Sequence, residues 1–228
     1  MINFEKTEVW GFEHALRGMR NPLNSWHKSD SAYKNEKHAI IGENDLKLAQ
    51  RLCRAGSEHR KFMRQIFVSV DISAPLYWWK EADTYKVGTV ANSCSTMHKI
   101  HEKEFTLDDF SCEHLVHTYS LERIIKDLNF WRGAFLIKDD DERVEYISKR
   151  FDSAYNNVIL SKKDCWWQMI QLLPSSYNQK RTVTMNYENL YAMYRQRKHH
   201  KLNEWSIGFV NWIETLPYAK ELIICEDN

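Results

Sequence analysis

The sequence predicts a mixed α/β fold of the α+β type. Glycine and proline are scarce, with seven and four residues in a chain of 228, and this balance favours long helices joined by short turns. Apolar residues alternate over 66–72, which predicts a strand, and a second short strand is expected over 181–185. A chain of this length can bury one sizeable core, so we expect a single domain over residues 1–228.

Two helices are expected in the first third of the chain. Apolar residues within 10–19 share one helical face, and Asn21-Pro22 ends that pattern before a polar stretch, 24–37, that is typical of a surface loop. A second helical pattern runs from Asn44 to Gly56. The strand over 66–72 then leads into a helix at Pro75, where the missing N–H costs nothing.

The remaining two thirds are expected to be mainly helical. Residues 105–165 carry a core-facing apolar stripe, and Thr106 and Ser120 are suited to cap helix starts. Ser161-Lys162-Lys163-Asp164 resembles a capping box, and the helix that it opens ends before Pro174. After the second strand, two further segments have an apolar helical face, namely 190–197 and 202–216.

Composition bears on partners and compartment. Lysine and arginine number 32 against 31 acids, a formal charge of +1, so no overall field attracts nucleic acid or an anionic membrane, and we expect neither as a partner. The chain lacks an apolar run of about 18 residues, and its N-terminus has no basic region followed by an apolar one. Five scattered cysteines without a CxxC pair favour reduced thiols. We therefore expect a soluble, cytoplasmic protein.

The segment from Ser73 to Lys99 carries the most chemistry. An aromatic-rich run after Pro75 leads into a cluster of small hydroxyl and amide residues, which usually face a ligand or another backbone. The alternative is a loop whose hydroxyls bond their own backbone. Further along the chain, Cys112, His114 and His117 lack a second spaced pair of ligands, so no metal site is expected.

A second group lies near the C-terminus, where Leu173-Pro174, Tyr177, Asn186 and Leu190 precede Arg197. An arginine on the last turn of a helix offers a phosphate a planar, bidentate donor on a rigid element. The alternative is a solvated basic run over 195–201, which also favours the helix dipole.

Both groups resemble flavin-dependent thymidylate synthases. Ala74-Pro75 aligns with an alanine-proline pair of that family, and Lys80-Glu81 occupies the place of its arginine-glutamine pair. The family's flavin-holding arginine-histidine-arginine triplet falls on Thr84-Tyr85-Lys86, and Thr89 stands near a signature serine. The C-terminal group keeps the family's spacing without a gap, and Arg197 takes the place of its phosphate-binding arginine.

The rest of the signature is altered. After one extra residue, Asn92 aligns with the family's asparagine, Ser93 replaces its glutamate and Ser95 matches its serine, whereas Met97-His98 replaces the closing arginine-tyrosine. A methionine cannot donate the charge-assisted hydrogen bond of an arginine. Ser57-Glu58-His59 resembles the family's glutamate-histidine, whose histidine touches flavin, although His59 is equally well explained as a helix-surface residue.

The resemblance covers roughly residues 57–205 and implies a curved antiparallel sheet packed with long helices, in a homotetramer that binds nucleotide and flavin between subunits. The nucleotide-binding residues that it implies are Glu81, Asn92, Ser93, Ser95 and Arg197. The cofactor-binding residues that it implies are His59, Thr84, Tyr85, Lys86, Thr89 and Asn186.

The implied activity is that of a thymidylate synthase-like methyltransferase of nucleotide biosynthesis. Reduced FAD would pass a one-carbon unit from methylenetetrahydrofolate to dUMP, with NADPH supplying electrons. No catalytic residue is assigned, and Cys94 and Ser95 are not expected to be nucleophiles. Because signature arginines are missing, the alternative is a divergent relative, for example one encoded by a phage, that binds, sequesters or differently modifies a pyrimidine nucleotide without flavin. A third hypothesis is an interaction protein with no small ligand.

Overall fold

The computed structural model describes residues 2–35, 38–151 and 160–225. Its described residues form two compact units. The helical unit contains residues 75–77 and 94–179, and the sheet unit contains residues 2–74, 78–93 and those from 180 onward. The single domain expected over 1–228 stays a prediction.

The sheet unit is built on a four-stranded sheet with the strand order β1-β4-β6-β5. Both β1–β4 and β5–β6 pair antiparallel. The predicted strand over 66–72 is confirmed, because its alternating apolar residues Val68, Val70 and Ile72 are buried. The four strands are β1 (Asn3–Trp10), β4 (Phe67–Pro75), β5 (Val90–Ser93) and β6 (Asn178–Asn186). The strands β2 (Ala32–Asn35) and β3 (His38–Ile40) pair in a separate two-stranded sheet.

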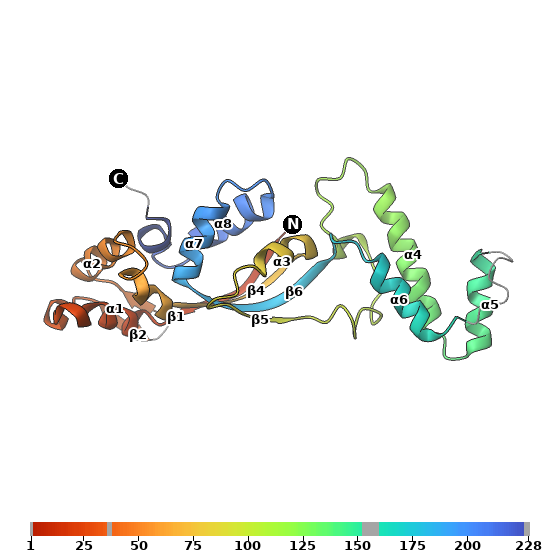
Figure 1. Ribbon diagram of the computed structural model, residues 1–228, viewed down its shortest axis with the longest axis horizontal. Helices are drawn as coiled ribbons and strands as arrows, with labels where there is room; N and C mark the ends of the chain where they lie inside the picture. The colour runs from red at the N-terminus through yellow and green to blue at the C-terminus, as the bar shows by residue number, and fades with distance from the viewer. Residues whose placement is uncertain (1, 36–37, 152–159, 226–228) are drawn as a thin grey trace. The chain divides into compact units, whose positions relative to one another are not determined.

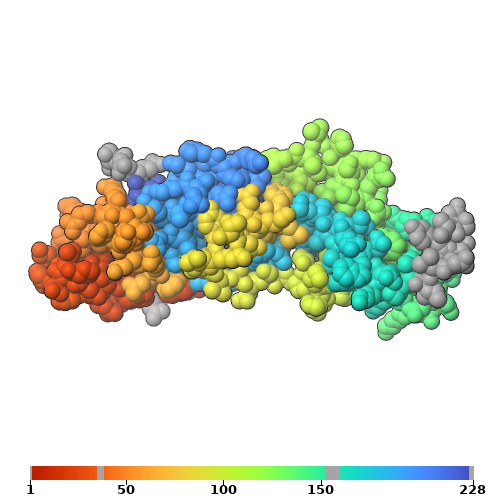
Figure 2. Space-filling model, viewed as in Figure 1, coloured from red at the N-terminus to blue at the C-terminus, as the bar shows by residue number. Residues whose placement is uncertain are grey.

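Helices cover one face of this sheet. The helices α3 (Leu76–Ala82), α7 (Tyr187–Arg197) and α8 (Val210–Glu214) lie over it (Figure 1). Two π-helical turns, Glu204–Phe209 and Lys220–Ile224, complete this layer. In the space-filling view, the yellow segment around α3 and the blue C-terminal helices form one continuous surface (Figure 2).

Aromatic rings fill the space between these helices and the sheet. The Trp78 ring lies 4.4 Å from that of Trp205 and 6.1 Å from that of Phe209, measured between centroids. Elsewhere on the sheet, Phe4 of β1 stacks on Trp212 of α8 at 4.7 Å. Large rings in such offset and tilted contacts contribute both buried area and favourable ring electrostatics, so they fix α3 and the C-terminal helices on the sheet.

The N-terminal part of the sheet unit contains α1 (Phe12–Arg20), α2 (Glu43–Arg54) and a 3₁₀ helix, Arg60–Gln65. Gly11 precedes α1 with φ 98°, and a Cβ there would lie 2.2 Å from the carbonyl oxygen of Gln65. Only glycine accepts both the left-handed backbone and this close approach.

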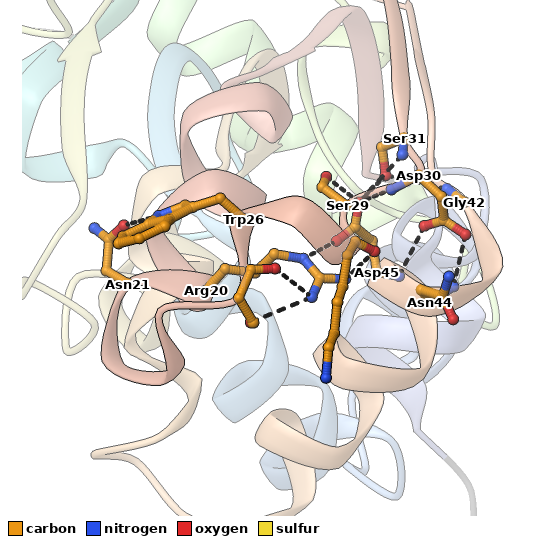
Figure 3. A network of polar contacts seen from close by, with 11 residues as sticks. Arg20, Asn21, Trp26, Ser29, Asp30, Ser31, Gly42, Asn44 and Asp45 are labelled. Atoms are coloured by element: carbon orange, nitrogen blue, oxygen red, sulfur yellow. Dashed lines mark hydrogen bonds and ion pairs between the residues drawn. The ribbon is translucent and has the colours of Figure 1, made fainter.

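A buried ion pair joins α1 to α2. Arg20 is 3% exposed and Asp45 is fully buried, and Nε of Arg20 donates to Oδ1 of Asp45 at 2.5 Å. The other oxygen of Asp45 accepts from the hydroxyls of Ser29 and Ser31 at 2.7 and 2.6 Å (Figure 3). Asp30 accepts from the backbone N–H groups of Asn44 and Asp45 at the start of α2. A buried charge with this many donors is satisfied.

The helical unit has its own core. It contains α4 (Tyr119–Leu136), α5 (Asp140–Phe151) and α6 (Lys162–Leu172), and α4 and α6 run side by side (Figure 1). The predicted capping box at Ser161 is confirmed, because Ser161 Oγ accepts from Asp164 N at 3.2 Å and Asp164 Oδ2 accepts from Ser161 N at 2.8 Å. The core of this unit includes Leu121, Leu128, Trp131, Ala134, Cys165 and Met169.

Several expectations about secondary structure were wrong. Most of 105–118 is irregular, with one 3₁₀ turn at Leu107–Asp109, and Ser120 lies inside α4, which follows Thr118. Strand β1 was missed because most of its residues are exposed, as on an edge strand, so apolar alternation is weak. The polar stretch 24–37 is also more than a loop, since it contains β2 and the serines that bind Asp45.

The helices α1, α2, α6 and α7 lie where the sequence predicts them. Among the described residues, no helix is both long enough and apolar enough to cross a membrane.

The Arg20–Asp45 pair predicts the acid sensitivity of the fold. Burial raises the pKa of Asp45, but hydrogen bonds from Ser31, Ser29 and Arg20 outweigh burial and hold that pKa below its usual range. Its contribution to the free energy of unfolding is therefore present above the unfolded-state pKa of about 3.9 and is lost as the pH falls through the folded-state pKa. We expect Asp45→Asn to lower stability by about 3 kcal/mol at pH 7 and to flatten its dependence on pH below about 4.

Urea unfolding between pH 2 and 7 measures both effects. Glu43→Gln, which alters the exposed ion pair with Lys47, is the control, and we expect a change below about 1 kcal/mol. An Asp45→Asn protein as stable as the parent at pH 7 would show that the buried ion pair does not stabilise the fold.

Candidate functional site

Three residues that the sequence places in a ligand site meet in the sheet unit. Arg197 is the last residue of α7, Glu81 lies in the last turn of α3, and Tyr85 lies in the turn that follows α3. Nη1 of Arg197 donates to Oε2 of Glu81 at 2.8 Å, and its Nε donates to the Tyr85 hydroxyl at 2.9 Å. That hydroxyl in turn donates to Oε1 of Gln196 at 2.8 Å.

Two further side chains complete this group, which we call the arginine cluster (Glu81, Tyr85, Arg197, His200 and Trp205). The same oxygen of Glu81 accepts from Trp205 Nε1 at 2.9 Å and lies 3.3 Å from His200 Nε2. The guanidinium carbon of Arg197 lies 4.7 Å from the centroid of the Trp205 ring and 5.4 Å from that of Tyr85. Arg197 is thus held both by hydrogen bonds and by two aromatic rings.

The electrostatics of the arginine cluster limit what it can bind. The side chains of Arg197 and Glu81 are 16% and 33% exposed, so their charges offset each other in a partly desolvated setting. Among the described residues, no hydrogen bond reaches Nη2 of Arg197, which leaves a donor for an incoming oxygen. A phosphate that binds through Nη1 as well must displace the carboxylate of Glu81.

A tight loop beside α7 contains several of the predicted cofactor residues. Gly88 has φ +73°, and a Cβ there would lie 2.9 Å from both Asn186 Nδ2 and Asn189 Oδ1. Asn189 Nδ2 donates to the Val87 carbonyl at 2.7 Å, while Asn186 Oδ1 caps α7 by accepting from Asn189 N at 3.0 Å. The predicted cofactor residue Asn186 is therefore already engaged in capping and lies against this loop.

Thr89 has an unusual environment for a predicted cofactor residue. Its hydroxyl and the indole N–H of Trp78 are buried, and neither has a hydrogen-bond partner among the described residues. Both residues line a small cavity of about 30 Å³, which has room for one water. Because a buried polar group without a hydrogen-bond partner is costly, we expect a water in this cavity.

Other predicted residues make local contacts. The Thr84 hydroxyl donates to the Glu81 carbonyl at 2.7 Å, and the Ser95 hydroxyl accepts from the backbone N–H groups of Met97 and His98 at 3.2 and 2.9 Å. For Thr84 and Ser95, these contacts agree with the alternative to a ligand site, which is a loop whose hydroxyls form hydrogen bonds with its own backbone. Lys86, Asn92 and Ser93 are exposed, the last two on β5 opposite Thr182 and Arg181. Ser95 belongs to the helical unit and the arginine cluster to the sheet unit.

His59 lines a larger cavity, of about 770 Å³, which we call the N-terminal cavity. Its lining residues are Gly18, Met19, Asn21, Pro22, Leu23, Arg51, Leu52, Glu58, His59, Lys61, Phe62, Arg64 and Gln65. His59 immediately precedes the 3₁₀ helix Arg60–Gln65. Apolar side chains form part of the wall, among them Met19, Leu52 and Phe62, and Lys61 and Arg64 add positive charge. Arg64 is paired with Glu188, with Nη2 3.2 Å from Oε1.

Sequence reasoning missed two members of the arginine cluster. Trp205 was assigned to a core-facing stripe and His200 to a basic run. The indole N–H of a buried tryptophan needs an acceptor, and this requirement was the available signal. The sequence does not indicate which residue is the acceptor, because Glu81 is 124 positions away from Trp205.

Comparisons with known proteins bear on the fold. No protein-family profile and no curated protein sequence matches this chain. A crystal structure of thymidylate synthase X from Helicobacter pylori with FAD and dUMP matches with a TM-score of 0.59 and 14% identity, over 100% of this chain and 99% of that one. A second structure of the flavin-dependent thymidylate synthase from H. pylori, complexed with FAD and dUMP, matches with a TM-score of 0.57 and 14% identity, over 99% of each chain.

The chain thus has the fold of these flavin-dependent thymidylate synthases. The predicted fold class, an antiparallel sheet packed with helices, is confirmed. At 14% identity the likeness concerns the fold, so the ligands and the reaction are matters for proposal.

Gly88 provides a test of the loop beside α7. We expect Gly88→Ala to lower the free energy of unfolding by about 1–2 kcal/mol, because the left-handed backbone disfavours a Cβ and Asn186 and Asn189 leave no room for it. Val87→Ala is the matched control, since Val87 is 87% exposed and should change stability by less than about 0.5 kcal/mol. Equal stability of both variants in urea unfolding would show that the loop does not need a left-handed residue at position 88.

Proposed function

We propose that this protein is a flavin-dependent thymidylate synthase-like enzyme that uses reduced FAD to transfer a one-carbon unit from methylenetetrahydrofolate to dUMP, with NADPH as reductant. Its likeness to enzyme structures with FAD and dUMP, along the full chain, carries the proposal. The arginine cluster supports it, because Arg197 is held rigidly at the end of α7 with Nη2 available.

In this proposal the chain binds and orients ligands, and the flavin supplies the one-carbon and redox chemistry when bound. Arg197 binds the nucleotide phosphate, and an aromatic environment of Tyr85 and Trp205 keeps its guanidinium in place. The other residues of the proposed nucleotide site are Asn92, Ser93 and Ser95, together with Glu81, whose carboxylate the phosphate displaces from Arg197. We further propose that the enzyme acts as a homotetramer in the cytoplasm.

The fit of FAD to these residues is uneven. The N-terminal cavity, with His59 and apolar walls, has a volume within the range of small-molecule sites, about 300–1,000 Å³. The segment Thr84-Tyr85-Lys86 fits a pyrophosphate poorly. The Tyr85 hydroxyl is hydrogen-bonded to Arg197, and Lys86 is the single cation of the segment. His59 and the cavity wall are therefore the better-supported part of the proposed flavin site, and Thr84, Tyr85, Lys86, Thr89 and Asn186 are the weaker part.

A second candidate function is nucleotide binding without the flavin reaction. The poor fit of Thr84-Tyr85-Lys86 to a flavin pyrophosphate favours it, because Lys86 is the one cation of that segment and Tyr85 is bonded to Arg197. In this alternative the protein binds, sequesters or differently modifies a pyrimidine nucleotide.

Flavin spectroscopy separates the two candidates. The enzyme proposal predicts that the purified protein, after incubation with FAD, retains bound flavin that absorbs at about 450 nm. It also predicts that dUMP perturbs this spectrum. We expect Arg197→Ala to weaken dUMP binding about tenfold or more, since a hydrogen bond to a charged group contributes about 1.5–3 kcal/mol. Lys201→Ala, an exposed cation nearby in sequence, should leave binding unchanged.

Nucleotide binding by a protein that takes up no flavin would replace the first candidate with the second. If the protein binds neither flavin nor nucleotide, both candidate functions are excluded, and the hypothesis of an interaction protein with no small ligand is favoured.

Glu81→Gln tests the role of the carboxylate. We expect this variant to bind dUMP about tenfold more tightly, because the phosphate no longer competes with a charged internal partner, while the amide still accepts from Trp205 Nε1. Binding of deoxyuridine, which has no phosphate, should not change. Glu214→Gln, at an exposed position of α8, controls for net charge. Weaker dUMP binding by Glu81→Gln, measured calorimetrically, would instead mean that Glu81 positions Arg197 for the phosphate.

A further inference from the structure

A second cavity, of about 630 Å³, lies against α2, and we call it the basic cavity. Four cationic side chains line it, Arg20, Lys28, Lys47 and Arg51, and its described lining residues include no carboxylate. Lys47 and Arg51 are one helical turn apart on α2 and share a face, where like charges repel. Such a concave cluster of one sign attracts an anion.

The four cations differ in how they are already engaged. Arg20 is bound to Asp45, and Lys47 is paired with Glu43 at 2.5 Å in an exposed and therefore weak contact. Lys28 and Arg51 make no side-chain ion pair within the described part of the chain. The Arg20–Asp45 network fixes one wall of the cavity, because Ser29, directly after Lys28, donates to Asp45.

The basic cavity adjoins the N-terminal cavity. Leu23 and Arg51 line both of them. Leu23 is 53% exposed and Trp26, three residues later, is 51% exposed. The Trp26 indole donates to Oδ1 of Asn21, another residue of the N-terminal cavity, at 2.8 Å (Figure 3). Exposed apolar surface beside a cavity is typical of a binding site.

We propose that the two cavities form one binding site for an aromatic ligand that carries a pyrophosphate group. The aromatic ring packs against Leu23, Leu52 and Phe62 in the N-terminal cavity, and the phosphates bind Lys28, Lys47 and Arg51 in the basic cavity. Arg51 lies at the junction, where an arginine can both contact a ring and donate to a phosphate.

This site deepens the proposed function where that proposal is weakest, because Thr84-Tyr85-Lys86 lacks the charge to hold a pyrophosphate. FAD and NADPH both join an aromatic ring to a pyrophosphate, and so does a nucleoside triphosphate such as ATP. The inference rests on the proposed function only for the choice among FAD, NADPH and ATP as the ligand.

Titration calorimetry of the full chain with FAD, NADPH, ATP and riboflavin, each alone, tests the site. We expect Arg51→Glu to weaken binding of the tightest pyrophosphate-bearing ligand at least about tenfold, and Lys28→Glu to weaken it as well. Added salt should weaken binding to the parent protein more than to Arg51→Glu. Leu23→Ser should weaken binding of riboflavin, which has the ring without a pyrophosphate, whereas Lys28→Glu should not, because Lys28 lines the basic cavity and not the N-terminal cavity.

Lys126→Glu is the matched control, because it makes the same charge change at an exposed position of α4 in the helical unit, and its affinities should equal those of the parent. Circular dichroism melting confirms that each variant is folded. The proposal is overturned if FAD, NADPH and ATP all fail to bind, or if Arg51→Glu and Lys28→Glu bind them as tightly as Lys126→Glu does.

The outcome is separable from that of the proposed function. Titration of dUMP into Arg51→Glu and Arg197→Ala reports on the arginine cluster alone. ATP binding that depends on Arg51, together with no FAD or dUMP binding by any variant, would retain this site and remove the thymidylate synthase proposal.

Discussion

The carboxylate of Glu81 connects three parts of the sheet unit that are far apart in sequence. One of its oxygens accepts from Arg197 at the end of α7 and from Trp205 in the π-helical turn, and it lies close to His200 between them. The ring contacts of Trp78 with Trp205 and Phe209 hold α3 against the same C-terminal helices. Because a partly buried carboxylate is stable only with such donors, the aromatic packing and the polar cluster depend on each other.

This arrangement places structure and ligand binding in competition. An arginine that is free in solution loses side-chain entropy when it binds a phosphate, whereas Arg197 is already ordered by Glu81, Tyr85 and Trp205. The same Glu81 lowers the net charge that a phosphate meets. In both candidate functions, the affinity for the nucleotide phosphate is therefore reduced by the free energy needed to displace Glu81 from Arg197.

The N-terminal part of the sheet unit shows a different use of buried charge. The Arg20–Asp45 pair is deeply buried and satisfied by serine hydroxyls, so its role is to fix α1 against α2. Arg20 also lines the basic cavity. A rigid wall beneath exposed lysines is the condition under which a cation cluster can bind an anion without a large ordering cost.

The sequence by itself determined those features that depend on neighbours along the chain. The alternation of Val68, Val70 and Ile72 defines β4, and the Ser161–Asp164 capping box defines the start of α6, because both signals act within a few residues. The resemblance of spaced motifs indicated the fold, and it placed Glu81 and Arg197 in the proposed nucleotide site and Tyr85 in the proposed cofactor site.

Only the tertiary structure decided which partners Arg197 and Arg20 have. Arg197 and Glu81 are 116 positions apart, and Arg20 and Asp45 are 25 apart, so no local pattern pairs them. Strand β1 was also decided by the tertiary structure, because this exposed edge strand is fixed by its pairing with β4 rather than by its own apolar pattern. Short-range propensities are encoded in consecutive residues, whereas ion pairs and cavities arise where the packed chain brings distant segments together.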